Sequence, residues 1–168
     1  MTAWNPALSS LRNATVMPPE MVASTIKKAK RPLMVVGSLI NSIPEDITER
    51  IIKIVEKGDM EVALTGGSSL KVHKFRRRNI IGLIEIVNNL KNPEWSGFDG
   101  NGNYDLVCFI GVPYYIGSQG LSTLRSFAPH IKTVTLCRYM HPNADISYPT
   151  MHCEEWLKWL DALIENLE

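Results

Sequence analysis

The chain has 168 residues, of which 45% are hydrophobic and 21% charged, and eighteen basic side chains nearly balance seventeen acidic ones. These values are typical of a globular domain and exclude both a disordered chain and one coated with positive charge for nucleic-acid binding. No apolar run approaches the roughly 18 residues of a membrane-spanning helix, and residues 1–10 lack the pattern of a secretory signal. We expect a soluble, cytoplasmic protein with one domain over residues 1–168 and an N-terminal arm at about residues 1–16.

Four short β-rich runs, each followed by glycine or small polar residues, predict the strands. They are Pro32–Val36, Glu61–Leu64, Leu106–Ile110 and Lys132–Leu136. Nearly continuous apolar character, rather than alternation with polar residues, is typical of strands covered on both faces in a parallel sheet.

Helical spacing of apolar residues predicts segments between and after these strands. They are Pro19–Ala29, Glu45–Lys57, Asn79–Leu90, Leu121–Phe127 and Glu154–Leu167. Alternation of strands and helices predicts a doubly wound, mostly parallel, Rossmann-like α/β sheet with helices on both faces. Residues 92–103 fit a surface loop, whereas residues 1–16 and 140–150 fit neither period and are interpreted as arms that pack on the body or on a partner.

The carboxyl ends of the predicted strands are the candidate ligand site, because ligands of open parallel sheets bind at that edge, where strand order reverses. Glycine lets a backbone approach a phosphate closely, and Ser and Thr add hydroxyl donors. The candidate residues are Gly37, Ser38, Thr65, Gly66, Gly67, Ser68, Lys71, Gly111, Val112 and Pro113. There is no Gly-x-Gly-x-x-Gly motif, and an equally good interpretation of the glycines is that they only turn the chain after each strand.

Residues 71–78 contain five cations and His73, without an acidic residue before Glu85. The segment is interpreted as a contact for an acidic protein partner or for phosphates in preference to nucleic acid, with a solvated loop as the alternative. The four histidines are dispersed and no catalytic motif occurs, so no catalytic residue is assigned.

Three cysteines without Cys-x-x-Cys spacing argue against a disulfide framework or a zinc or iron–sulfur site, and we expect no metal in this chain. Cys108 alternates within a strand and is interpreted as a core residue. Cys137, beside Arg138 at a strand end, is the one thiol of chemical interest.

Five segments together resemble a known family: Ala14–Val16, Pro18–Glu20, Lys27–Gly37, Gly111–Gly117 and His141–Tyr148. The chain is similar over its whole length to the epsilon subunits of archaeal acetyl-CoA decarbonylase/synthase complexes, which belong to their carbon monoxide dehydrogenase component. The resemblance implies the NAD- or FAD-binding fold shared with deoxyhypusine synthase.

The resemblance also implies a function. It implies an accessory subunit, itself not catalytic, that stabilises the large catalytic (alpha) subunit and assists electron transfer to FAD, while the large subunit holds the nickel–iron–sulfur chemistry. We accordingly expect FAD at the strand ends, a homo-oligomer when the chain is isolated, and no nucleic-acid or membrane partner. The alternative is a freestanding nucleotide-dependent oxidoreductase or transferase. Tyr114 and Tyr115 are expected near the crevice, where they contact the large subunit or a second copy, together with the arm around Trp4.

Overall fold

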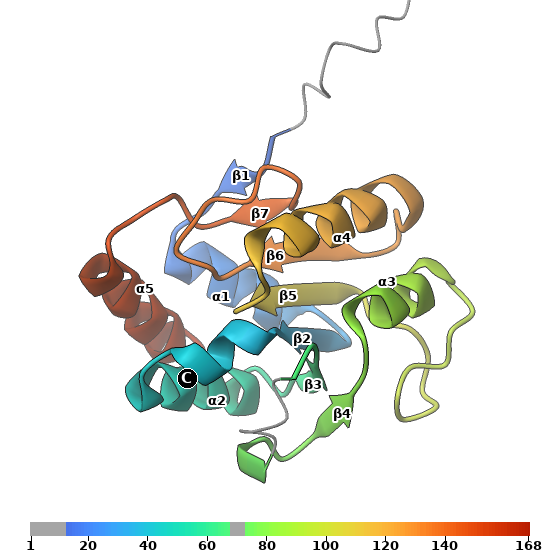
Figure 1. The fold of residues 1–168 in the computed structure, drawn as a ribbon, viewed down its shortest axis with the longest axis horizontal. Helices are drawn as coiled ribbons and strands as arrows, with labels where there is room; N and C mark the ends of the chain where they lie inside the picture. Colours follow the sequence, from blue (N-terminus) through green and yellow to red (C-terminus); the bar gives the residue numbers. More distant parts are fainter. Residues whose placement is uncertain (1–12, 68–72) are drawn as a thin grey trace, which may run out of the picture.

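The computed structural model describes residues 13–67 and 73–168, which form a seven-stranded, entirely parallel sheet with helices on both faces (Figure 1). The strands are β1 (Thr15–Val16), β2 (Pro32–Val36), β3 (Glu61–Leu64), β4 (Arg78–Ile80), β5 (Leu106–Ile110), β6 (Lys132–Thr135) and β7 (Ile146–Ser147). Their order across the sheet is β1-β7-β6-β5-β2-β3-β4. From β4 to β7 this is the dinucleotide-binding order, in which the direction of strand addition reverses between β2 and β5.

Three helices cover one face of the sheet and two cover the other. The helices are α1 (Pro19–Lys28), α2 (Glu45–Lys57), α3 (Leu83–Lys91), α4 (Tyr114–Phe127) and α5 (Cys153–Asn166), with the 3₁₀ helix η1 (Ser38–Ser42) after β2. Buried residues of α1, α2 and α5 share one apolar core with β2, β3 and β5. Buried residues of α3 and α4 form the second core on the opposite face.

Successive residues of β2 explain why this strand reads as uniformly apolar. Met34 and Val36 belong to the core under α1, α2 and α5, whereas Leu33 and Val35 belong to the core under α3 and α4. All five β2 residues are buried, as are all five of β5. The prediction of doubly covered parallel strands is confirmed, and the bounds of β2, β3 and β5 agree with it.

Two helix boundaries predicted from the sequence are wrong. The helix predicted to begin at Asn79 begins only after Gly82, as α3. Residues 78–80 instead form the edge strand β4, which pairs with Val62–Leu64 of β3. Helix α4 begins at Tyr114 rather than Leu121. Gly117 and Gly120 lower the apparent helix propensity of that segment, but both are buried where α4 packs closely on Val112 and Val87.

The two segments interpreted as arms contain the last two strands at one end of the sheet, the edge strand β1 and its neighbour β7. Thr15 and Val16 of β1 pair with Ile146 and Ser147 of β7, which in turn pairs with β6. Asp145 anchors this edge, because its Oδ2 accepts hydrogen bonds from the Thr133 N–H (2.8 Å) and from Thr133 Oγ1 (3.0 Å). Residues 1–12, including Trp4, lie outside the described residues.

Candidate functional site

The loops that follow β2 and β5 touch directly at the point where strand order reverses. Gly37 donates its N–H to the Ile110 carbonyl (2.9 Å), and Leu39 donates to the Gly111 carbonyl (3.0 Å). A Cβ on Gly37 would lie 2.3 Å from both Gly111 O and Val112 Cα. The glycine at position 37 is therefore explained by the contact between two loops, and its N–H is already used within the protein.

This contact separates two cavities at the carboxyl edge of the sheet. The first cavity, of about 340 Å³, lies above β3 and between α3 and α4. It is lined by Ser38, Thr65, Gly66, Gly82, Leu83, Ile84, Val112, Pro113, Tyr115 and Ile116. Five predicted site residues thus lie together here: Ser38, Thr65, Gly66, Val112 and Pro113.

The turn after β3 is built for close backbone approach. Gly66 and Gly67 have φ values of 55° and 75°, in the left-handed region that glycine adopts without strain. Asn41 of η1 donates from Nδ2 to the Gly67 carbonyl (2.7 Å) and so ties this turn to the loop after β2. Thr65 holds the base of the turn, because its N–H and Oγ1 both donate to the Val36 carbonyl (2.9 and 3.2 Å). The predicted Ser68 and Lys71 lie outside the described residues.

The second cavity, of about 420 Å³, lies on the other side of the contact, between η1, the start of α4, the chain after β6 and the start of α5. Its lining is mostly apolar. Gly111 and Val112 are the predicted site residues in it; the others are Leu39, Ser42, Ile43, Pro44, Ile47, Ile110, Tyr114, Cys137, Arg138, Tyr139, His141, Cys153 and Trp156.

His141 brings a buried polar atom to the second cavity. Its residue is only 3% exposed, its ring stacks on that of Tyr114 with centroids 4.3 Å apart, and its Nδ1 has no hydrogen-bond partner among the described residues. Burial lowers the pKa of His141, so the imidazole is neutral at pH 7. Tyr114 itself donates its hydroxyl to the Met140 carbonyl (3.0 Å).

Arg138 and two thiols complete the polar part of the second cavity. Arg138 donates to the Tyr139 hydroxyl (2.5 Å), its guanidinium lies over the Tyr139 ring, and its Nε is buried with no partner among the described residues. Burial raises the pKa of Cys137 to about 11, against a smaller opposing effect of the Gly111 backbone. Cys137 is thus a protonated thiol at neutral pH, and Cys153 is the first residue of α5.

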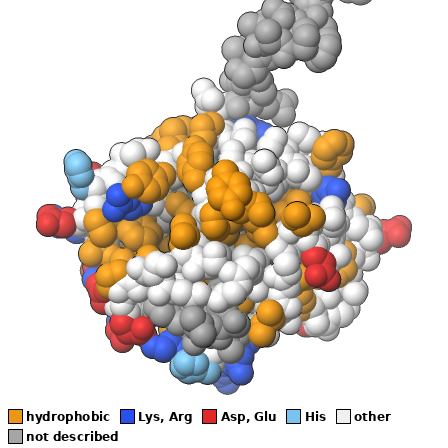
Figure 2. Space-filling view, in the orientation of Figure 1, with side chains coloured by type: hydrophobic (Ala, Val, Ile, Leu, Met, Phe, Trp, Pro, Cys, Tyr) orange, Lys and Arg blue, Asp and Glu red, His pale blue; other side chains and the backbone are white. Residues whose placement is uncertain are grey.

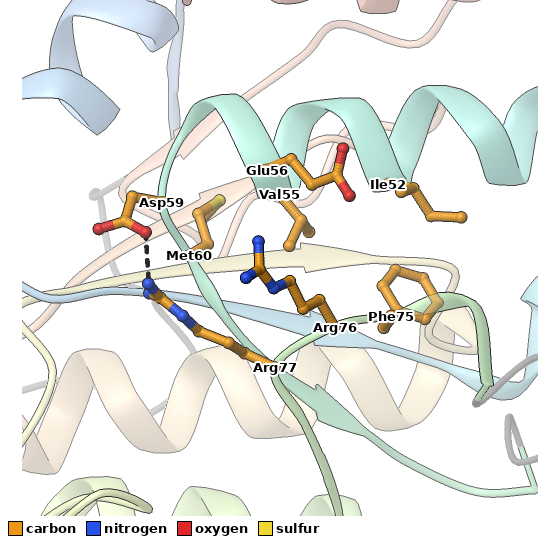
Figure 3. A pocket seen from close by; sticks show the side chains of 8 residues that line it. All are labelled: Ile52, Val55, Glu56, Asp59, Met60, Phe75, Arg76 and Arg77. Atoms are coloured by element: carbon orange, nitrogen blue, oxygen red, sulfur yellow. Dashed lines mark ion pairs between the residues drawn. The ribbon is translucent and has the colours of Figure 1, made fainter.

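The basic segment lies away from both cavities, around a third one of about 330 Å³ beside α2 (Figure 3). Phe75 is buried and anchors the segment, and Arg77 forms an ion pair with Asp59 (2.8 Å). Figure 3 shows Arg76 extending towards α2, the helix that carries Glu56. Lys74 pairs with Glu45. The described ion pairs thus give Lys74 and Arg77 each a carboxylate partner, and a contact of this segment with an acidic partner or with phosphates stays a prediction.

The sequence does not predict the second cavity, because its lining comes from segments that are distant in the chain. Cys137 is recognisable as a thiol at a strand end, but nothing local connects it with Tyr114, His141 or Trp156. Cys108 is fully buried, as expected, and burial raises the pKa of its thiol to about 12.

Residues 13–67 and 73–168 contain no helix with the length and apolar character to cross a bilayer. The described part of the chain also contains no cluster of three or more His, Cys, Asp or Glu side chains arranged to hold a metal ion.

Comparison with known proteins identifies relatives along almost the whole chain. Residues 4–164 match the family described as CO dehydrogenase beta subunit/acetyl-CoA synthase epsilon subunit. The chain is 42% identical to the acetyl-CoA decarbonylase/synthase complex subunit epsilon of Methanothermobacter thermautotrophicus, over 95% of this chain and 92% of that protein. It is 37% identical to subunit epsilon 1 of Archaeoglobus fulgidus (93% and 86%) and 35% identical to subunit epsilon 1 of Methanosarcina barkeri (89% and 86%). With nearly complete coverage on both sides, the chain belongs to the CO dehydrogenase beta subunit/acetyl-CoA synthase epsilon subunit family.

Proposed function

We propose that this protein is an accessory, non-catalytic subunit of the carbon monoxide dehydrogenase component of an acetyl-CoA decarbonylase/synthase complex. Its role is to bind and stabilise the large catalytic subunit and to assist electron transfer to FAD. The observation that carries the proposal is the match over residues 4–164 to a family whose curated members are named as subunits of that complex.

Exposed apolar side chains at the carboxyl edge support a docking role. Leu39, Ile84 and Tyr115 are 45%, 69% and 72% exposed, and they lie at the two cavities. Figure 2 shows hydrophobic side chains gathered across the upper part and the centre of this face of the molecule. Contiguous exposed apolar surface is a feature of protein interaction sites, and aromatic residues such as tyrosine are enriched there.

The docking proposal is tested by mixing the protein with purified large subunit and following complex formation by gel filtration. The double variant Ile84→Asp/Tyr115→Asp is expected to weaken the complex, because it places two charges in a desolvated contact. Phe127→Asp is the matched control, since Phe127 is equally exposed (68%) but lies at the opposite end of α4. Wild-type protein that does not co-elute with the large subunit would contradict the accessory role and favour the freestanding nucleotide-dependent enzyme.

Three observations support FAD at the first cavity. The sheet has the dinucleotide-binding strand order, the Gly66–Gly67 turn allows backbone approach, and Ser38 offers a hydroxyl beside it. The N-terminus of the 14-residue helix α4 also borders this cavity through Pro113 and Tyr115, and helix N-termini attract phosphate groups. In this proposal the diphosphate lies near Gly66, Gly67 and the start of α4 rather than at the N–H of Gly37, which already donates to the Ile110 carbonyl.

FAD binding is tested by titration of flavin fluorescence with and without the large subunit. A saturable signal is expected, and Gly67→Val is expected to remove it, because valine is strained at φ 75° and blocks approach to the backbone. Circular dichroism must show that this variant is folded. No binding in either condition would contradict the flavin role while leaving the docking role intact.

A further inference from the structure

No ligand is assigned to the second cavity in the function proposed above, although this cavity is larger than the first (about 420 against 340 Å³). Its walls are mainly the side chains of Leu39, Ile43, Ile47 and Trp156 and the rings of Tyr114 and Tyr139. A concave, largely apolar site of this size with a few convergent polar groups is the usual form of a small-molecule site.

Two polar atoms at this cavity have no partner among the described residues. They are Nδ1 of His141, a residue that is only 3% exposed, and Nε of Arg138. Buried polar atoms in proteins almost always have a hydrogen-bond partner, so each of these two atoms marks a place where a bound molecule or a water can supply one. Both side chains line it, and both can donate an N–H.

The charges around the second cavity indicate which charge a bound ligand should carry. Arg138 is the only charged side chain in the lining, and none of the ion pairs among residues 13–67 and 73–168 involves it. The first residue of the 14-residue helix α5, Cys153, also lines the cavity, so the positive end of that helix dipole lies at the same site. An anionic group is therefore favoured here over a neutral or cationic one.

We propose that the second cavity binds a small molecule with an aromatic or other apolar body and a single anionic head group. The head group accepts hydrogen bonds from Arg138 and His141, and the body lies against Leu39, Ile43 and Trp156. This site is distinct from the proposed FAD site, because the Gly37–Gly111 contact separates the two cavities and Val112 is the one residue common to their linings.

The test uses two dyes that share a ring system and differ in charge. 8-Anilinonaphthalene-1-sulfonate carries the anionic head, and N-phenyl-1-naphthylamine lacks it. We expect one sulfonate dye to bind per chain, with energy transfer from Trp156, and at least about tenfold more tightly than the neutral dye, because charge-assisted hydrogen bonds are the strong ones. Equal affinity of wild-type protein for the two dyes would overturn the proposal without any variant.

Variants locate the site. Arg138→Met keeps the apolar stem and removes the charge, so it is expected to reduce affinity for the sulfonate dye at least about tenfold and to leave the neutral dye within about twofold. Ser42→Trp is expected to fill the cavity and abolish binding of both dyes. Ile84→Trp, in the first cavity, is the matched control and is expected to change neither.

Three outcomes would contradict a separate site in the second cavity: wild-type affinity for the sulfonate dye in Arg138→Met, retention of both dyes by Ser42→Trp, or displacement of the dye by FAD. Because the dye titration requires neither FAD nor the large subunit, its failure is distinguishable from failure of the proposed function.

Discussion

His141 is the residue whose environment differs most from what its sequence position suggests. Its position beside Pro142 indicates a loop histidine, yet the side chain is buried, stacks on Tyr114 and lines the second cavity. Its backbone is fixed as well, because its N–H donates to Ser147 Oγ (3.1 Å) in β7. Burial of a neutral imidazole has a measurable consequence for stability.

The lowered pKa of His141 predicts loss of stability on acidification. Above its unfolded-state pKa of about 6.5 the ring is neutral in both states and contributes no pH dependence. As the pH falls below that value the unfolded chain binds the proton first, so the free energy of unfolding decreases by up to about 1.4 kcal/mol per pH unit. His141→Phe, which retains a ring against Tyr114, is expected to flatten this dependence between pH 7.5 and 5.

Thermal unfolding followed by circular dichroism at several pH values checks this expectation. Identical pH profiles for wild type and His141→Phe would show that the histidine is not buried in solution.

At the scale of elements, α5 completes the core on its face of the sheet. It packs on α1 and α2, and Trp156, Leu160 and Leu163 are buried in the shared core. Trp156 also donates its Nε1–H to the Leu136 carbonyl (2.7 Å), just beyond the end of β6. This hydrogen bond and the burial together fix the helix over the sheet.

Trp156→Ala is expected to lower the free energy of unfolding by about 3–5 kcal/mol, because it leaves a cavity and an unpaired carbonyl. Urea unfolding measures the difference. Lys158→Ala, on the exposed side of the same helix, should change stability by less than about 0.5 kcal/mol. A loss below about 1 kcal/mol in Trp156→Ala would mean that α5 is not needed to close the core.

At the scale of the whole molecule, the exposed apolar residues of the carboxyl edge predict self-association of the isolated chain. The surface proposed to bind the large subunit is free when that subunit is absent, and two copies can then bury it against each other. The double variant Ile84→Asp/Tyr115→Asp is expected to shift the protein towards monomer in sedimentation velocity, whereas Phe127→Asp should not. A wild-type protein that is monomeric at all concentrations would refute this prediction.

The N-terminal arm is a second candidate for assembly. Deletion of residues 1–13 should weaken self-association or complex formation if the arm around Trp4 takes part. The deletion leaves β1 intact, since that strand begins at Thr15. Unchanged oligomeric state and unchanged complex formation would remove the arm from the interface.

The sequence alone determined the parallel α/β class, four of the strands and helix α2 with its bounds, because each of these depends on local information. A buried parallel strand such as β5 needs an unbroken apolar run, and an amphipathic helix such as α2 needs apolar residues at helical spacing between Pro44 and Gly58. The glycines at the strand ends likewise marked the edge at which the first cavity lies.

Only the tertiary structure decided the rest, because contacts between distant segments leave no local pattern. The two-residue strands β1 and β7 are too short to show a period and exist through their pairing. Position 37 must be glycine because a Cβ there would collide with Gly111 and Val112, which are about 75 residues further along the chain, and not because of a local turn. The second cavity depends on Tyr114, Arg138, His141 and Trp156 meeting at one edge of the sheet. Packing across that edge leaves two polar atoms, Arg138 Nε and His141 Nδ1, without partners among the described residues.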